Sequence, residues 1–223
     1  MYSRTQRVVG KNNIEKIKSL NIAVLGLGGV GGYVAEMLAR IGVGNLTIVD
    51  FDIVDVSNIN RQIIALQNNI GEYKTDLFKE RIALINPNCK VSAVKEKVLK
   101  ENINLLISSN FDYVIDAIDD VEAKIDLIEF CQKNNIKLLS SMGTGNRYKE
   151  IPRYQVCDIF KTSYDKLAKK IRQKLKERNI FKAEVVCSTQ QPEKVEELGS
   201  VVYYPLMCAG TIVSYVINKC LSE

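Results

Sequence analysis

The stretch Asn21-Ile-Ala-Val-Leu-Gly-Leu-Gly-Gly-Val-Gly31 decides the fold, because an apolar run leads directly into a glycine-rich turn. Residues 21–26 are predicted as a buried strand and residues 30–41 as the following helix. The turn has the pattern GxGxxG, formed by Gly26, Gly28, Gly29 and Gly31. Between a strand and a helix, this pattern is typical of a turn that binds a nucleotide phosphate at the helix N-terminus. The alternative is a tight turn that binds no ligand.

A carboxylate follows at the position where such a fold binds a ribose. Asp50 comes nineteen residues after Gly31, at the end of a second predicted strand over 45–50. A side chain at this place accepts hydrogen bonds from ribose hydroxyls. The glycine pattern and Asp50 together do not separate NAD from ATP as the ligand.

Strand and helix patterns alternate along the first 150 residues. Further strands are predicted over 91–94, 111–115 and 136–140, and further helices over 74–85, 101–107 and 122–134. This alternation predicts an α/β fold of the Rossmann-like type, with a doubly wound, mostly parallel sheet and helices on both faces.

The pattern changes in the last third of the chain. Strands are predicted there over 154–157, 183–187 and 201–204, and helices over 165–178 and 206–220. No linker or low-complexity segment separates the two parts, so we predict a single domain over 1–223. Residues 1–150 are its nucleotide-binding core, and residues 151–223 are a C-terminal extension of mixed strands and helices.

The composition excludes several kinds of site. The 223 residues include no histidine, which rules out Ser-His-Asp and Cys-His catalysis and HExxH zinc sites. The six cysteines form no CxxC pair, so we expect no zinc. The first residues carry charges without a following apolar run, which predicts a cytoplasmic protein with free thiols. The uncharged run 198–218 contains Pro205 and three tyrosines, and we interpret it as a buried strand and helix rather than a membrane span.

Positive charge is concentrated in one segment. Residues 161–182 hold nine Lys or Arg against Asp165 and Glu177, whereas the net charge of the whole chain is only +5. The apolar residues of this segment recur at helical spacing, which predicts an amphipathic helix with a cationic face. Taken alone, the charge pattern favours a solvated surface helix over a contact with a phosphate backbone.

A polar cluster follows the second predicted strand. It contains Asp52, Asn58, Arg61 and Lys74, and Asp119 follows the strand predicted over 111–115. A hydride-transfer enzyme has no evident use for this cluster. In a nucleotidyl-transfer enzyme, Arg61 and Lys74 neutralise a triphosphate while Asp52 or Asp119 holds magnesium. Each residue also has an ordinary alternative: Lys74 as an exposed cation at a helix start, Arg61 in a surface ion pair, and Asp119 as a helix N-cap.

This combination resembles the ThiF/MoeB group of ATP-dependent, ubiquitin-activating-enzyme-like proteins over nearly the whole chain. The resemblance implies that residues 1–223 form a ThiF-type adenylation domain that uses ATP and Mg²⁺. It also implies a homodimer in which Tyr2-Ser-Arg4 sends Arg4 into the partner subunit's ATP site. By the same resemblance, Asp50 holds the ribose, Asn58, Arg61 and Lys74 bind the phosphates, and Asp119 orients magnesium and the reacting groups.

The second half of the chain resembles one subfamily, the tRNA threonylcarbamoyladenosine dehydratases. The resemblance is carried by Ser141-Met-Gly-Thr-Gly-Asn-Arg147, Asp158-Ile-Phe-Lys-Thr-Ser163, Asp165-Lys-Leu-Ala168 and the basic helix. Lys166 and Cys187 depart from it, because the subfamily usually has proline at the first position and we expect an aromatic residue at the second. With tRNA as the substrate, the favoured interpretation of the cationic face is that it contacts backbone phosphates. The predicted tRNA contacts are Arg147, Lys169, Lys170, Arg172 and Lys174.

The resemblance implies a reaction on threonylcarbamoyladenosine next to the tRNA anticodon. Adenylation of the threonyl carboxylate makes AMP the leaving group, and an intramolecular nucleophile then closes a ring with net loss of water. A possible sulfur-transfer partner would use Cys187 or Cys208, but buried structural cysteines are the commoner case. The first alternative is an adenylyltransferase that activates the C-terminus of a ubiquitin-like sulfur carrier. The second is an NAD-binding oxidoreductase or sensor.

Overall fold

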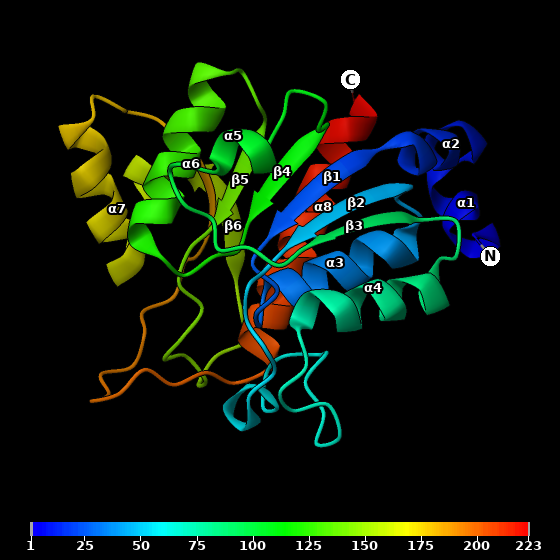
Figure 1. Cartoon of the computed structure of the whole chain (residues 1–223). Coiled ribbons are helices and arrows are strands. Elements are labelled where there is room, and N and C mark those ends of the chain that lie inside the picture. Colours follow the sequence, from blue (N-terminus) through cyan, green and yellow to red (C-terminus); the bar gives the residue numbers. More distant parts are fainter. Residues whose placement is uncertain (1, 223) are drawn as a thin grey trace.

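A seven-stranded sheet organises the molecule, in the order β3-β2-β1-β4-β5-β7-β6 (Figure 1). This computed structural model describes residues 2–222, so Met1 and Glu223, the two ends of the predicted domain, lie outside the described residues. Neighbouring strands are parallel except for the antiparallel pair β6 and β7. The strands are β1 Asn21–Leu25, β2 Asn45–Val49, β3 Lys90–Val94, β4 Tyr113–Asp116, β5 Leu138–Ser141, β6 Tyr154–Asp158 and β7 Glu184–Ser188.

Helices cover both faces of the sheet, which confirms the Rossmann-like α/β prediction (Figure 1). Ile22 and Val24 pack into the core cluster that contains α3 and α8, whereas Ala23 and Leu25 belong to the cluster on the opposite face, with α5 and α6. Successive strand residues point to opposite faces, so an apolar run such as 21–25 is buried on both. The helices are α1 Ser3–Val9, α2 Lys11–Ser19, α3 Gly31–Ile41, α4 Lys74–Ile85, α5 Ile103–Leu106, α6 Val121–Lys133, α7 Lys166–Glu177 and α8 Tyr203–Ser222.

The glycine turn joins β1 to α3 because a side chain does not fit there. Gly26 has a φ of +85°, and a Cβ at this position would lie 2.8 Å from the carbonyl oxygen of Ala117. A Cβ at Gly31 would lie 1.8 Å from the carbonyl oxygen of Gly26. These two glycines therefore let the turn close against the loop that follows β4.

The strand predicted over 201–204 is wrong. Val201 and Val202 lie in the segment before α8, and Tyr203 and Tyr204 are the first two residues of that helix. Pro205 is the third residue of α8, in the first turn, where its missing N–H costs no helical hydrogen bond. The apolar and aromatic run thus belongs to the start of the helix and not to the sheet.

The helices α1 and α2 precede the first predicted element. In α2 only Ile14 and Ile17 are buried, so its apolar stripe is short. None of the helices within residues 2–222 combines the length and the hydropathy of a membrane span.

Candidate active site

The glycine turn leaves open space beside a buried amide. A Cβ at Gly28 would have the Gln62 Nε2 as its nearest neighbour, at 3.9 Å. Gln62 is only 7% exposed, yet its Oε1 is buried without a hydrogen-bond partner in the described part of the chain. A buried polar atom normally has a partner. The open space at Gly28 therefore lets a bound molecule approach the backbone of the turn, beside an amide whose oxygen is unsatisfied in the described chain.

Asp50 lies buried directly after β2, with its carboxylate fixed by the backbone. Its Oδ2 accepts a hydrogen bond from the Leu27 N–H at 2.5 Å, and its Oδ1 accepts one from the Asp52 N–H at 2.8 Å. Burial raises the pKa of Asp50, while these two hydrogen bonds and the charge of Lys74 oppose the rise. A carboxylate has about four lone-pair sites, so acceptor capacity remains for ribose hydroxyls.

Lys74 is the first residue of α4 and is only 3% exposed. Its Nζ lies 2.9 Å from Oδ2 of Asp52, whose side chain is about half exposed. The alternative of an exposed cation at a helix start is therefore wrong. A buried cation with one partner at the protein surface is suited to an anionic group that approaches from solvent.

Asn58 and Arg61 lie in the loop between β2 and α4. Asn58 closes a capping box, because its Oδ1 accepts a hydrogen bond from the Asp55 N–H at 3.2 Å. Arg61 donates through one nitrogen to the Ser57 carbonyl at 2.7 Å and to Oδ1 of Asn60 at 2.9 Å. The described residues give Arg61 no carboxylate partner, so the surface ion-pair alternative is wrong. A Cβ at Gly29 would lie 3.6 Å from Cγ of Arg61, so its stem lies beside the glycine turn.

Asp120, and not Asp119, caps α6. The Asp120 Oδ1 accepts a hydrogen bond from the Ala123 N–H at 3.0 Å, which corrects the N-cap alternative for Asp119. Asp119 is exposed and makes no hydrogen bond or ion pair within residues 2–222. No group of three or more Cys, Asp or Glu in that range is arranged to hold a metal by itself. A single free carboxylate still fits magnesium that is shared with substrate phosphates.

Arg4 is not brought to this site within its own chain. It is exposed on α1, and the ring of the adjacent Tyr2 packs against Gly42, at the C-terminal end of α3. The glycine turn lies at the opposite end of this eleven-residue helix, about 16 Å away along its axis. An ATP contact by Arg4 therefore requires a second subunit.

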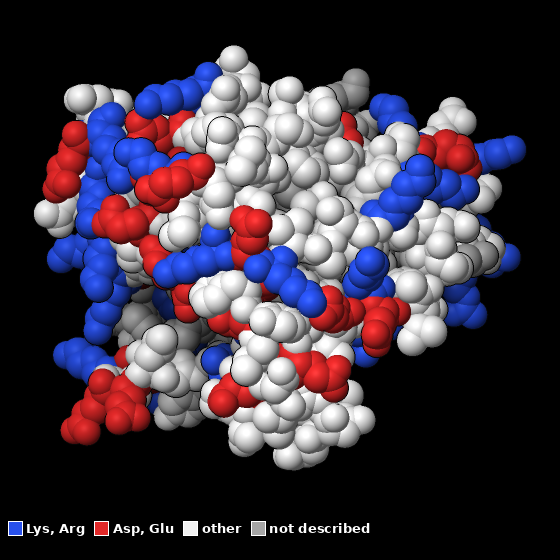
Figure 2. Space-filling view, in the orientation of Figure 1, with Lys and Arg blue, Asp and Glu red and all other residues white. Residues whose placement is uncertain are grey.

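The predicted tRNA contacts fall into two groups. Lys169 and Lys170 are exposed on α7 and have no partner among the described residues, and Figure 2 shows Lys and Arg atoms gathered over this helix at the left edge. Arg172 and Lys174 bond within the chain, the former to residues 159 and 162 and the latter to Glu122.

Arg147 is buried, which corrects its prediction as a tRNA contact. Its guanidinium donates at 3.1 Å to the carbonyls of Gly143, Gly145, Tyr164 and Gln190. Arg147 therefore joins the segment 143–145 to the loops that contain Tyr164 and Gln190.

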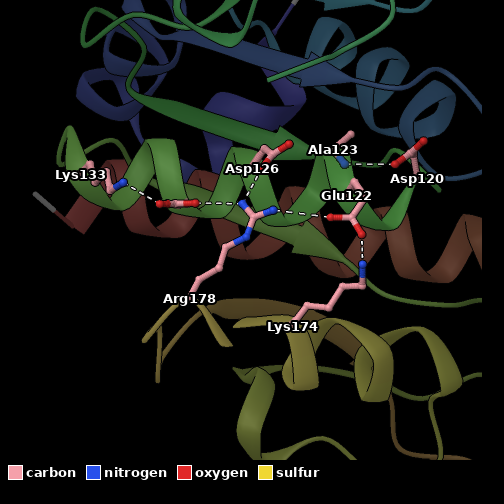
Figure 3. A network of polar contacts seen from close by, with 8 residues as sticks. Asp120, Glu122, Ala123, Asp126, Lys133, Lys174 and Arg178 are labelled. Atoms are coloured by element: carbon pink, nitrogen blue, oxygen red, sulfur yellow. Dashed lines mark hydrogen bonds and ion pairs between the residues drawn. The ribbon is translucent and has the colours of Figure 1, made fainter. Parts of the chain in front are cut away.

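A network of ion pairs, absent from the sequence predictions, joins α7 to α6 (Figure 3). Arg178, directly after α7, reaches Glu129 at 2.8 Å and also contacts Asp126 and Glu122. Hydrogen bonds from Lys133 and Arg178 lower the pKa of Glu129. The acidic residues recur three and four positions apart on α6, and this spacing was the available signal. The network holds the inner face of α7 and leaves the face with Lys169 and Lys170 free.

The two candidate sulfur-relay cysteines are buried. Burial raises the pKa of Cys187 and of Cys208 to about 12. Both are therefore thiols at neutral pH, and a thiol is a poor nucleophile compared with a thiolate. This environment favours the structural alternative for both residues.

Comparison with known proteins places the chain in a family. The model of the ThiF family matches residues 2–219. The tRNA threonylcarbamoyladenosine dehydratase of Bacillus subtilis is 44% identical over 197 residues, covering 88% of this chain and 77% of that protein. The Haemophilus influenzae protein of that name is 35% identical over 217 residues, covering 95% and 80%.

A solved structure agrees with this assignment. The Escherichia coli tRNA N6-threonylcarbamoyladenosine dehydratase in complex with ATP matches with a TM-score of 0.94 and 35% identity, covering 99% of this chain and 93% of that chain. The same Escherichia coli protein has also been solved with AMP. The chain belongs to the ThiF family and, within it, to the tRNA threonylcarbamoyladenosine dehydratases.

Proposed function

We propose that this protein is an ATP-dependent tRNA threonylcarbamoyladenosine dehydratase that releases AMP and pyrophosphate. The observation that supports the proposal most is the set of polar residues at the carboxyl ends of the strands, in a chain of this family. The buried Asp50 and Lys74 and the unpaired Asp119 follow β2, begin α4 and follow β4, respectively. The carboxyl ends of parallel strands beside the strand-order reversal are where such folds bind ligands.

The nucleotide contacts follow from the positions of these side chains. Asp50 accepts from the ribose, while Lys74, Arg61 and Asn58 contact the phosphates. Preorganised donors aimed at developing charge contribute about 10²–10³ in rate each. Binding of the triphosphate would compete with Asp52 for Lys74, because the two lie 2.9 Å apart.

Asp119 is the residue proposed to hold magnesium. Its carboxylate is exposed and has no partner in the described chain, and magnesium usually keeps one or two protein carboxylates together with phosphate oxygens. When bound, the metal neutralises charge on the phosphates. Asp119→Asn should raise the magnesium concentration needed for half-maximal AMP release, and an unchanged requirement would exclude this role.

Ring closure needs alignment more than a strong base. The nucleophile belongs to the same modified nucleoside as the activated carboxylate, and ideal alignment within one molecule is worth about 7–11 kcal/mol. This fits a chain without histidine and with buried cysteine thiols. The same buried thiols give no support to a sulfur-transfer partner.

The proposed tRNA surface is the outer face of α7, with Lys169 and Lys170 as its main contacts. Lys79 of α4 and Lys100, which follows β3, are also exposed and have no partner in the described chain. They lie toward the β3 edge, so Lys79→Glu with Lys100→Glu is a charge-matched control. Lys169→Glu with Lys170→Glu should weaken tRNA binding about 10- to 100-fold at low salt and flatten its salt dependence. Equal behaviour of the two double variants would contradict the proposal.

We further propose a cytoplasmic homodimer of single-domain subunits, in which Arg4 completes the partner's ATP site. A groove of about 630 Å³ runs between β6 and α8 and includes the exposed Met207, which offers a surface for a second copy. Arg4→Ala and Lys74→Ala subunits should each be inactive alone. Recovery of activity on mixing would support shared sites, and no recovery would contradict them.

A carrier-protein adenylyltransferase is the weaker alternative. It would use the same nucleotide contacts but has no use for the cationic face of α7. AMP release that depends on modified tRNA, and not on a carrier protein, separates the two.

A further inference from the structure

A completely buried ion pair lies beside the proposed active site and makes none of the proposed nucleotide or tRNA contacts. Lys124 of α6 and Asp116 at the end of β4 are each 0% exposed, and the Lys124 Nζ lies 2.9 Å from the Asp116 Oδ2. The same Nζ donates to Oγ of Ser140 at 3.2 Å and to the carbonyl of Ser141 at 2.8 Å. All three donors of the ammonium group are used.

Stability alone does not explain this pair. Burying two charges removes their hydration, and replacing buried ion pairs with apolar side chains of similar volume is often neutral or stabilising. Removing only one partner is destabilising, because it leaves an uncompensated charge. The pair therefore points to a requirement for a defined arrangement of the segments that it joins.

On one side, the pair fixes the loop that carries Asp119. The second carboxylate oxygen of Asp116 accepts a hydrogen bond from the Ile118 N–H at 3.1 Å. The carbonyl of Ala117 in the same loop lies against the glycine turn at Gly26. Residues 117–119 are thus held at their start by Asp116, and Asp116 is held by Lys124.

On the other side, the pair fixes the segment that leads to the basic helix. Lys124 binds the carbonyl of Ser141, and two residues later the Gly143 N–H donates to Oδ2 of Asp165 at 2.9 Å. Asp165 is the N-cap of α7. One ammonium group therefore contacts the ends of both β4 and β5.

We propose that Lys124 is a positioning residue that fixes the nucleotide-side loop 117–119 relative to the substrate-side segment 141–143. This inference rests on the proposed function, in which the two segments would lie on either side of the activated carboxylate and the nucleophile that attacks it. Loss of the pair leaves the contacts of Asp50 and Lys74 intact. ATP binding therefore persists, while the magnesium contact of Asp119 weakens and alignment of the second step is lost.

The test uses a double variant, Asp116→Asn with Lys124→Met, which removes both charges together. At saturating magnesium, the KM for ATP should stay within about twofold, and the rate of nucleoside dehydration should fall about 10- to 100-fold. AMP released per dehydrated nucleoside should rise above one. Lys133→Met is the matched control, because Lys133 lies on the exposed side of the same helix and pairs with Glu129.

Amide hydrogen exchange supplies a readout that needs no tRNA. Both 117–119 and 141–143 should exchange faster in the double variant and remain unchanged in Lys133→Met. If the double variant does not fold, Ser140→Ala removes one contact of the ammonium group and one of the Asp116 carboxylate, and it should show both effects in weaker form. If the double variant exchanges faster but the wild-type protein dehydrates no nucleoside, the proposed function is refuted and the positioning role is not. Unchanged exchange in either segment, or an AMP ratio that stays at one, overturns the role of Lys124.

Discussion

The nucleotide-side edge of the sheet and the outer face of α7 carry charge in opposite ways. At the sheet edge, Asp50 and Lys74 are buried and held by backbone groups or by one carboxylate. On α7, Lys169 and Lys170 are exposed, and the helix is joined to α6 by partly exposed ion pairs. Buried charges are screened little by salt, whereas exposed charges more than a Debye length apart are largely screened. The first region therefore suits a nucleotide held in a fixed geometry, and the second suits salt-dependent binding of the tRNA backbone.

The largest expected effect is on stability and comes from a substitution in the glycine turn that folding, and not ATP binding, should fail to tolerate. Gly31→Ala places a Cβ 1.8 Å from a backbone oxygen, which side-chain movement cannot relieve. We expect a loss of about 3 kcal/mol or more in the free energy of unfolding, measured by denaturant titration.

Gly28→Ala is the matched control. Its Cβ would find its nearest neighbour at 3.9 Å, so the fold should keep its stability while ATP affinity falls. Equal stability of the two variants would contradict this description of the turn.

The second effect concerns the buried cation. Lys74→Met should lower kcat/KM for AMP release about 10²- to 10³-fold, because it removes charge stabilisation from the phosphates. Its Asp52 partner is about half exposed and becomes hydrated, so the fold should persist. A steady-state assay with circular dichroism as the control for folding checks this, and a loss below threefold would remove Lys74 from the site.

The smallest effect tests the network between α6 and α7. The pKa of Glu129 is lowered in the folded state, so its contribution is present above the unfolded pKa and is lost as pH falls through the folded value. Glu129→Gln should cost about 0.2–1 kcal/mol at neutral pH. In urea titrations, the difference from wild type should stay constant from pH 7 down to the ordinary glutamate pKa of 4.5 and shrink below it. A difference that grows on acidification would contradict the network.

Periodicity and turn chemistry made most of the fold predictable. Apolar runs such as 21–25, bounded by glycine or polar residues, predicted all seven strands to within two residues. The largest shifts are at β4 and β5, which begin at Tyr113 and Leu138 rather than at 111 and 136. The wrong strand at 201–204 has the apolar and aromatic residues of a strand, and only packing of α8 on the core decides its conformation.

The bonding partners of the charged side chains were harder to predict than the elements on which these side chains lie. Asp119 and Asp120 are chemically identical neighbours, and only the backbone geometry at the start of α6 decides which one becomes the cap. Likewise, Lys169 and Lys174 look equivalent in sequence, but the acidic partner of Lys174 comes from another helix, 52 residues away.

The central claim is tested most directly by the mass of the modified nucleoside. The protein is incubated with ATP, Mg²⁺ and tRNA that carries threonylcarbamoyladenosine, and the digested nucleosides are weighed by mass spectrometry. We expect loss of one water from that nucleoside, together with release of AMP, and both changes should be about 10²- to 10³-fold slower with the Lys74→Met variant. An unchanged nucleoside mass in the presence of folded, ATP-binding protein would contradict this function.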